Sequence, residues 1–401
     1  MCSKTVTETN CMLPRVAVFA DCSNSYGRRL LQGIADYVDV FGPWSLYLET
    51  ASHGDWGLDQ FKDWKGDGIL AYVRDTQAAS SLNELEIPII ETYSDVSDIN
   101  IRTVGNDELA IGTIGARHFM ERNYQQFAFV GYEHEFWSLK REEGFTRYLY
   151  YQGRASESYH TPHRPVDLKS WESEQEKLQA WLMALPRPIA IMACSDSMAR
   201  SIMDCCYRAS IRIPEDIAIL GVGDDEEICR LSSPSLSSVR DNPERVGYLA
   251  AELLDKIMSG KQDVEPAKPI IVPPLEIETR QSTDHIAVND ELITHALHII
   301  RNRYTFKIDI NTVLDELEVS RALFFRRFKA ALGRSPLDEL TRCRIDHAKR
   351  LLASSSLGLD KIASKSGFTD SQHLCVSFKR NLKITPIEYR KQSINQRKKH
   401  Q

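Results

Sequence analysis

The sequence predicts a two-lobed α/β domain, built from two doubly wound parallel sheets, followed by an all-α domain with two helix-turn-helix units. Three observations lead to this fold class. Short apolar strands alternate with amphipathic helices along most of the chain, and the last quarter contains one short helical pattern twice. Basic residues are concentrated in that last quarter, behind an acidic front part.

Length and composition are those of a globular protein with two or three domains. The 401 residues are 42% hydrophobic and 26% charged, which is enough apolar material for a core in each domain. No apolar run reaches the ~20 residues that span a membrane, and the N-terminus lacks the layout of a signal peptide. We therefore expect a cytoplasmic protein. The nine cysteines show no metal-ligand spacing, so we expect reduced cysteines, no metal and no cofactor.

The net charge of −6 conceals an asymmetry between the two parts of the chain. From residue 286 to the end there are 22 Lys and Arg against 12 Asp and Glu, a balance of +10. The first 285 residues hold the remaining 28 against 44, a balance of −16. A basic block behind an acidic one indicates a phosphate-binding module attached to a second, different domain.

Strand and helix patterns alternate in two rounds through the front part. We expect strands at 15–20, 44–48, 68–73 and 87–90, another before Asp107, and helices at 25–41 and from 107 to 122. The second round has strands at 127–130, 189–193, 217–222 and 270–277, with helices near 138–151, 171–184, 196–209 and 242–259. This βαβ alternation predicts parallel sheets with right-handed crossovers. Two successive halves predict two lobes with a cleft between them.

The domain boundaries follow from the changes in pattern. We expect an N-terminal tail at 1–14, the two-lobed domain at 15–280, a polar linker at 281–290, a helical domain at 291–393 and a basic tail at 394–401.

Acidic side chains follow four of the predicted strands, namely Asp21, Asp107, Asp196 and Asp224. In open α/β sheets, ligands bind beyond the carboxyl ends of the strands, so these side chains are candidates for one polar pocket. Carboxylates and arginine bond vicinal hydroxyls, and an aromatic ring stacks on the C–H face of a sugar, so a small sugar or polyol is the best-matched ligand. The full set of ligand candidates is Asp21, Ser25, Tyr26, Glu91, Asp107, Trp137, Arg141, Asp196 and Asp224. The alternatives are an N-cap for each Asp, a surface position for Arg141 and a core position for Trp137.

The repeated pattern in the last quarter consists of a short apolar helix, a tight turn and a second amphipathic helix. The two copies lie near 309–331 and 359–382, and their second helices begin after the caps Ser320 and Asp370. Gly367 supplies the positive φ of the second turn, and Ala363 lets its two helices approach closely.

This double helix-turn-helix resembles the AraC/XylS class of bacterial transcription regulators, including the pairs Phe328-Lys329 and Phe378-Lys379 and the ending 385–390. Glu318 and Lys383 stand where that family usually has glycine. If their backbones are left-handed, each costs about 1 kcal/mol. Residues 15–280 resemble the periplasmic-binding-protein-like domain of the LacI/GalR regulators, in the stretches 127–131, 194–200 and 221–224 and in Arg141. In that class, the residues at Arg141, Asp196 and Asp224 face the sugar.

The first resemblance implies which side chains meet DNA. On the first recognition helix, Ala322, Phe325 and Arg326 occupy base-facing positions, with Phe325 alternatively packed, while Arg321, Arg327 and Lys329 suit phosphates. On the second, Ser371, Gln372 and Val376 face bases, and Lys379 and Arg380 suit the backbone. We expect Leu374 and Phe378 to point inward and not to contact bases.

The combination of both domain types in one chain resembles bacterial regulators of pentose utilisation, and it implies an activator that binds a pentose, xylose in that family. Such a protein binds double-stranded operator DNA, as a homodimer associated with the nucleoid, and works with RNA polymerase. Another sugar or polyol is an alternative effector. A carbohydrate-active enzyme fused to a regulator is a different class, but no phosphate-binding loop or catalytic set is indicated by spacing. A third alternative is a solute-binding subunit of a transporter, and the missing export signal argues against it.

Overall fold

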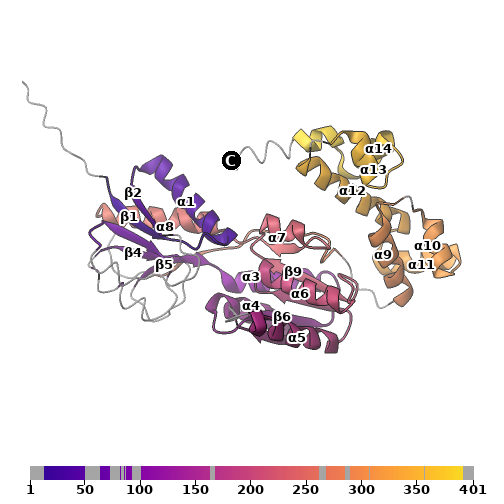
Figure 1. The fold of residues 1–401 in the computed structure, drawn as a ribbon, viewed down its shortest axis with the longest axis horizontal. Helices are drawn as coiled ribbons and strands as arrows, with labels where there is room; N and C mark the ends of the chain where they lie inside the picture. The colour runs from indigo at the N-terminus through magenta and orange to yellow at the C-terminus, as the bar shows by residue number, and fades with distance from the viewer. Residues whose placement is uncertain are drawn as a thin grey trace, which may run out of the picture. The chain divides into compact units, whose positions relative to one another are not determined.

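The computed structural model describes residues 13–49, 64–72, 82, 85, 87–92, 101–162, 168–261, 268–284, 290–306, 308–355 and 357–391. Residues 1–12 of the expected N-terminal tail, the expected C-terminal tail and residues 285–289 of the expected linker lie outside these residues. The chain forms two compact units, residues 1–285 and 286–401, which are described separately (Figure 1).

The described residues of the first unit form two parallel sheets. The first sheet has the order β11-β5-β4-β3-β1-β2 and the second has the order β12-β10-β9-β8-β6-β7. Their strands are β1 (Arg15–Phe19), β2 (Ser45–Glu49), β3 (Gly68–Ala71), β4 (Ile89–Glu91), β5 (Arg102–Asn106), β6 (Phe127–Tyr132), β7 (Glu157–Thr161), β8 (Ile189–Ala193), β9 (Ile217–Val222), β10 (Ser237–Val239), β11 (Ile270–Val272) and β12 (Ile277–Glu278). All ladders are parallel except that of β10 and β12. The predicted fold class is confirmed.

Helices cover these sheets and begin at polar caps. They are α1 (Ser25–Phe41), α3 (Glu108–Met120), α4 (Phe136–Tyr151), α5 (Leu168–Ala184), α6 (Asp196–Arg208), α7 (Glu226–Leu231) and α8 (Pro243–Met258). Side chains of Asn24, Asp107, Ser195, Asp225 and Asn242 each accept a hydrogen bond from a first-turn backbone N–H. Strands β7 and β10 and helix α7 were not predicted from the sequence.

The two lobes are not successive halves of the chain, which corrects the prediction. The late elements α8 and β11 belong to the first lobe, where α8 packs on α1 (Figure 1). The chain therefore crosses between the lobes after Asn106, between Val239 and Pro243, and between Val272 and Ile277. The expected single strand at 270–277 is two strands in different sheets, since the prolines at 273 and 274 have no N–H to donate to a ladder.

Each lobe contains a helix pair that approaches closely at glycines. A Cβ on Gly33 of α1 would meet the Glu244 carbonyl of α8, and one on Gly247 would meet the Leu30 carbonyl. In the second lobe, Gly112 of α3 lies equally close to the Arg141 carbonyl of α4. Close packing of α3 on α4 brings the start of α3 next to Arg141, which matters for the site.

The second unit consists of two small helical cores joined by a long helix. Its helices are α9 (Glu291–Arg303), α10 (Ile310–Leu317), α11 (Arg321–Leu332), α12 (Pro336–Ser354), α13 (Leu359–Lys365) and α14 (Ser371–Leu382). Phe324 and Phe328 lie in the first core, and Leu374 and Phe378 in the second. The α12 helix contributes Leu340 to the first core and Ile345 to the second. Hence the two helix-turn-helix units form one body.

The predicted turn chemistry of this unit is confirmed. Ser320 and Asp370 cap α11 and α14 through their side chains, and Gly367 has φ +78°. Glu318 and Lys383 are left-handed, with φ +52° and +63°. In the part of the chain that the structure describes, no helix is both long and apolar enough to cross a membrane.

Candidate functional site

Polar side chains from both lobes surround Tyr26, near the start of α1. The Tyr26 hydroxyl donates to the Thr92 carbonyl and accepts from Asn106 Nδ2, each at 3.4 Å. Burial raises the pKa of Tyr26 well above its usual value, and the carboxylates of Asp241, Glu108 and Glu91 raise it further. Because Glu108 lies on α3 of the second lobe, Tyr26 marks where the two lobes meet. Glu91, a ligand candidate, is buried at the end of β4.

Arg141 is held at this place by contacts on two sides. Its Nε donates to Glu108 Oε2 at 2.5 Å, and one terminal nitrogen donates to the Cys194 carbonyl at 2.6 Å. The guanidinium lies over the Trp137 ring, 4.8 Å from its centroid. Trp137 is buried and also meets Tyr132 edge-on at 5.8 Å. Arg141 is therefore a buried, oriented donor.

Asp196 is the first residue of α6 and is 3% exposed. Its Oδ1 accepts from Ser238 Oγ at 2.6 Å and its Oδ2 from the Asp225 N–H at 2.8 Å. Burial raises the pKa of Asp196 to about 7, although both hydrogen bonds favour the carboxylate. This carboxyl is consequently poised between its two protonation states near neutral pH.

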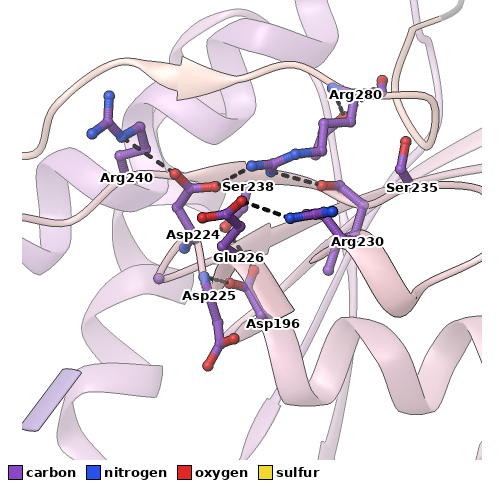
Figure 2. Close-up of polar contacts among 12 residues, drawn as sticks. Asp196, Asp224, Asp225, Glu226, Arg230, Ser235, Ser238, Arg240 and Arg280 are labelled. Atoms are coloured by element: carbon purple, nitrogen blue, oxygen red, sulfur yellow. Dashed lines mark hydrogen bonds and ion pairs between the residues drawn. The ribbon is translucent and has the colours of Figure 1, made fainter. Parts of the chain in front are cut away.

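Asp224 has a left-handed backbone, with φ +49°, and its carboxylate lies between two arginines (Figure 2). Arg280 reaches Oδ1 at 2.7 Å and Arg240 reaches Oδ2 at 3.3 Å. The Asp224 N–H donates to Ser238 Oγ at 2.9 Å. Ser238 thus joins Asp224 to Asp196 in one network.

Two of the ligand candidates make contacts near their own turns. Asp107 caps α3, accepting from the Ala110 N–H at 2.8 Å. Asp21 accepts from the Ser23 N–H at 2.9 Å. Ser25 is half-buried at the start of α1. The structure therefore places Glu91, Tyr26 and Arg141 in one cluster and Asp196 with Asp224 in a second.

Four polar residues of these clusters were missed by sequence reasoning: Glu108, Ser238, Asp241 and Arg29. Arg29 of α1 donates to both carboxylate oxygens of Glu244, at 2.7 and 2.9 Å, and to Asp241 Oδ1 and the Gly223 carbonyl, at 3.0 and 2.8 Å. Burial raises the pKa of Asp241 to about 6, opposed by the charge of Arg29. Asp241 follows a strand, like the four predicted aspartates, but that strand was not predicted. Asp241 was therefore not recognised as a residue at the end of a strand.

A groove of about 880 Å³ lies elsewhere, between α3 and the crossovers. Its lining comprises Ile114, Arg117, His118, Glu121, Arg122, Arg240, Pro274, Leu275, Glu276, Ile277 and Thr279. None of the ligand candidates lines it. The strand-end clusters remain the better candidate site, because they lie where parallel sheets bind ligands.

The first predicted recognition helix, α11, presents most of its candidates to solvent. Arg321, Ala322, Arg326 and Lys329 are exposed, and Phe325 is half-buried against the first core. The Arg321 guanidinium lies 4.9 Å from the Phe325 ring centroid. Arg327, another predicted phosphate contact, is exposed and its guanidinium makes a two-pronged ion pair with Asp290, the cap of α9. In this structure a carboxylate already occupies that candidate phosphate contact.

The second recognition helix, α14, has the same orientation relative to its core. Gln372, Val376, Lys379 and Arg380 are exposed, and Ser371 is half-buried. Val376 is 62% exposed although it is apolar. A face of this kind is available to a groove of DNA.

Two α/β lobes joined by three crossovers, followed by two helix-turn-helix units, define a transcription regulator with a periplasmic-binding-protein-like sensor domain. Sequence profiles agree along the chain: an N-terminal domain of xylose regulators matches residues 15–103, a periplasmic binding protein-like domain matches 116–283 and a helix-turn-helix domain matches 313–392.

Whole-length relatives identify the group more closely. The xylose operon regulatory proteins of Haemophilus influenzae and Escherichia coli K12 are each 29% identical to this chain over 94% of its length, covering 98% and 96% of their own. The solved structure of a xylose-binding transcription activator is 27% identical, with a TM-score of 0.78 over 95% of this chain and 98% of that one. A LacI family regulator from Mycobacterium smegmatis, at 19% identity and TM-score 0.58, shows the same fold for 68% of the chain. Along nearly its whole length the chain is therefore similar to xylose operon regulatory proteins, and it carries the helix-turn-helix domain of a DNA-binding transcription regulator.

Proposed function

We propose that this regulator binds a pentose, D-xylose, between its two lobes and activates genes of pentose use. The observation that carries the proposal is the buried Arg141, held by Glu108 and Cys194 over Trp137. Because this guanidinium is already held in place, it can donate to sugar hydroxyls without a further loss of side-chain entropy on binding. Similarity to xylose regulators along the whole chain supports the choice of sugar.

The remaining ligand candidates supply acceptors around this donor. We assign sugar contacts to Asp21, Ser25, Tyr26, Glu91, Asp107, Trp137, Arg141, Asp196 and Asp224. A sugar that bonds residues of both lobes favours the arrangement in which they approach each other, and it acts only through that difference in affinity. The domain boundaries stay as inferred from the sequence, with a sensor at 15–280, a linker at 281–290 and a DNA-binding domain at 291–393.

The exposed faces of α11 and α14 suit two successive major-groove segments, about 10 bp apart. Arg326 is assigned to guanine and Gln372 to adenine, because their donors and acceptors match those base edges. Ala322, Phe325, Ser371 and Val376 face neighbouring bases, and Arg321, Lys329, Lys379 and Arg380 bind phosphates. A homodimer in the cytoplasm, acting with RNA polymerase on operator DNA, completes the proposal.

A thermal-shift series against pentoses and hexoses tests the effector. D-xylose at 100 times its dissociation constant stabilises its binding domain by about 2.7 kcal/mol. We expect Arg141→Met to abolish this shift. Arg147→Met provides a matched control, since Arg147 is an exposed residue of the same helix that pairs with Glu143. A shift with another sugar or a polyol, and none with D-xylose, would change the effector but keep the class.

A further inference from the structure

The carboxylate of Asp224 connects three parts of the first unit. It follows β9 at the candidate sugar site, Arg240 belongs to the crossover between β10 and α8, and Arg280 follows β12, near Asp284, the last described residue of the first unit. Figure 2 shows the two arginines approaching the carboxylate from opposite sides, with Arg280 at 2.7 Å and Arg240 at 3.3 Å. A ligand that bonds Asp224 must share this carboxylate with both arginines.

The segment that begins at Arg280 is bound tightly to the second lobe. The Arg280 N–H donates to Ser237 Oγ at 2.8 Å, and its guanidinium donates to the Leu236 carbonyl at 3.0 Å. Thr283 is fully buried, bonded to His118 through its hydroxyl at 2.8 Å and to Arg122 through its carbonyl at 2.9 Å. Arg280 therefore connects the chain segment that leads to the second unit with Asp224 at the strand-end site.

Arg240 links the same carboxylate to the connections between the lobes. The Arg240 carbonyl accepts from the Leu275 N–H at 2.8 Å, which joins two crossovers. The next residue, Asp241, accepts from Arg29 of the first lobe at 3.0 Å. Rotation of one lobe against the other changes the backbone that carries Arg240.

Asp224 itself is held in a costly conformation. Its φ of +49° lies in the left-handed region, which residues other than glycine adopt rarely. Ser238 accepts from the Asp224 backbone N–H and donates to Asp196 Oδ1, so the Asp224 backbone and the Asp196 carboxyl belong to one hydrogen-bonded set. Such a set responds as a unit when one member acquires a new partner.

We propose that Arg280, acting through Asp224, transmits the effect of sugar binding to the DNA-binding unit. Sugar hydroxyls that donate to Asp224 compete with Arg280 and Arg240 for its two oxygens. Arg280 then loosens from the carboxylate, and residues 280–284 change their contacts with the second lobe. Arg280 is a positioning residue, since it acts through the carboxylate of Asp224. The inference rests on the proposed function.

The test uses full-length protein, D-xylose as the ligand and operator DNA selected by the protein from a random pool. In Arg280→Gln, D-xylose affinity stays equal or becomes higher, because a competitor for Asp224 is gone. The ratio of DNA affinities with and without D-xylose falls from at least about fivefold in the parent to near one. Arg280→Lys restores part of the ratio. Arg230→Gln serves as the control, because Arg230 pairs with the exposed Glu226 close by and keeps the parental ratio.

Arg240→Gln provides a second route to the answer should Arg280→Gln fold poorly, since its side chain is nearly half exposed, and its ratio falls as well. Parental ratios in both variants would overturn the inference. A parent that binds D-xylose without any change in DNA affinity would overturn the relay alone. A parent that does not bind D-xylose would instead overturn the proposed effector, and with it the relay.

Discussion

Arg327 on α11 and Asp290 at the start of α9 form a two-pronged ion pair, with Nε to Oδ2 at 2.8 Å and a terminal nitrogen to Oδ1 at 2.7 Å. Asp290 also caps α9, so a residue beside the linker is bonded to the first recognition helix. Two adjacent exposed arginines on α11 consequently differ in their contacts, since Arg327 pairs with Asp290.

The first prediction separates these two arginines. Arg326→Ala should weaken operator binding and relax base preference, because a bidentate arginine–guanine contact is worth about 1–3 kcal/mol. Arg327→Ala should change base preference little and lower stability instead. Titration of labelled operator variants, together with urea unfolding, measures both effects. Equal base discrimination by Arg326→Ala and the parent would contradict the placement of α11 in the groove.

The second prediction concerns Glu339, a fully buried carboxylate bonded by Arg301, Arg334 and Arg342. Glu339→Gln removes the buried carboxylate that these three largely covered arginines share, although Arg342 also pairs with Asp346 at 3.5 Å. The second unit should therefore lose about 3–5 kcal/mol in its free energy of unfolding. Urea unfolding measures the loss. Glu316→Gln is the control, because Glu316 pairs with Arg303 at the surface and should change stability by less than about 1 kcal/mol. Similar losses in both variants would refute a central role for Glu339.

The third prediction uses two left-handed glycines of the second unit. A Cβ on Gly367 would lie 2.0 Å from the Tyr304 carbonyl oxygen, whereas one on Gly333 would meet nothing within 4 Å. Gly333→Ala should therefore cost only the conformational penalty of about 1 kcal/mol. Gly367→Ala should cost clearly more, since the second turn must also move away from residue 304. Equal melting temperatures for the two variants would show that this contact is absent.

The fourth prediction is a pH dependence that originates in Asp196. Its pKa in the folded protein, about 7, lies above the unfolded value, so folding takes up a proton between those two values. The stability it contributes is complete below the unfolded pKa and is lost as the pH rises through about 7. Asp196→Asn should lose less stability than the parent between pH 5 and 8, as measured by melting temperature. The pKa of Asp241, about 6, gives the variant a residual slope at lower pH. Parallel profiles would refute the assignment.

Fully buried strands were predictable from the sequence, because β8 and β9 are continuous apolar runs in the centre of a sheet. In contrast, β10 consists of Ser237, Ser238 and Val239, and its serines are buried only because Ser282, Arg280 and Asp196 bond them. Such pairings join residues about 40 positions apart and leave no local pattern.

The candidate site was likewise predictable only in part. Asp196 and Arg141 follow recognisable strands, and the structure places both in buried polar clusters. Their partners are Ser238 on β10, Glu108 at the start of α3, and the pair of Arg29 on α1 with Asp241 in a crossover. The sequence pattern, divided into two successive halves, did not bring these residues together. The three crossings between lobes depend on sheet pairing over long separations, so strand periodicity alone does not reveal them.

The most direct test of the whole account is the operator affinity of the full-length protein, measured by fluorescence anisotropy at one fixed salt concentration with and without D-xylose. We expect D-xylose to change the dissociation constant by about fivefold or more, and Arg141→Met to remove that change while Arg147→Met keeps it. If the parent protein binds both D-xylose and operator DNA but has the same dissociation constant for DNA with and without D-xylose, the proposal of a D-xylose-responsive regulator is contradicted.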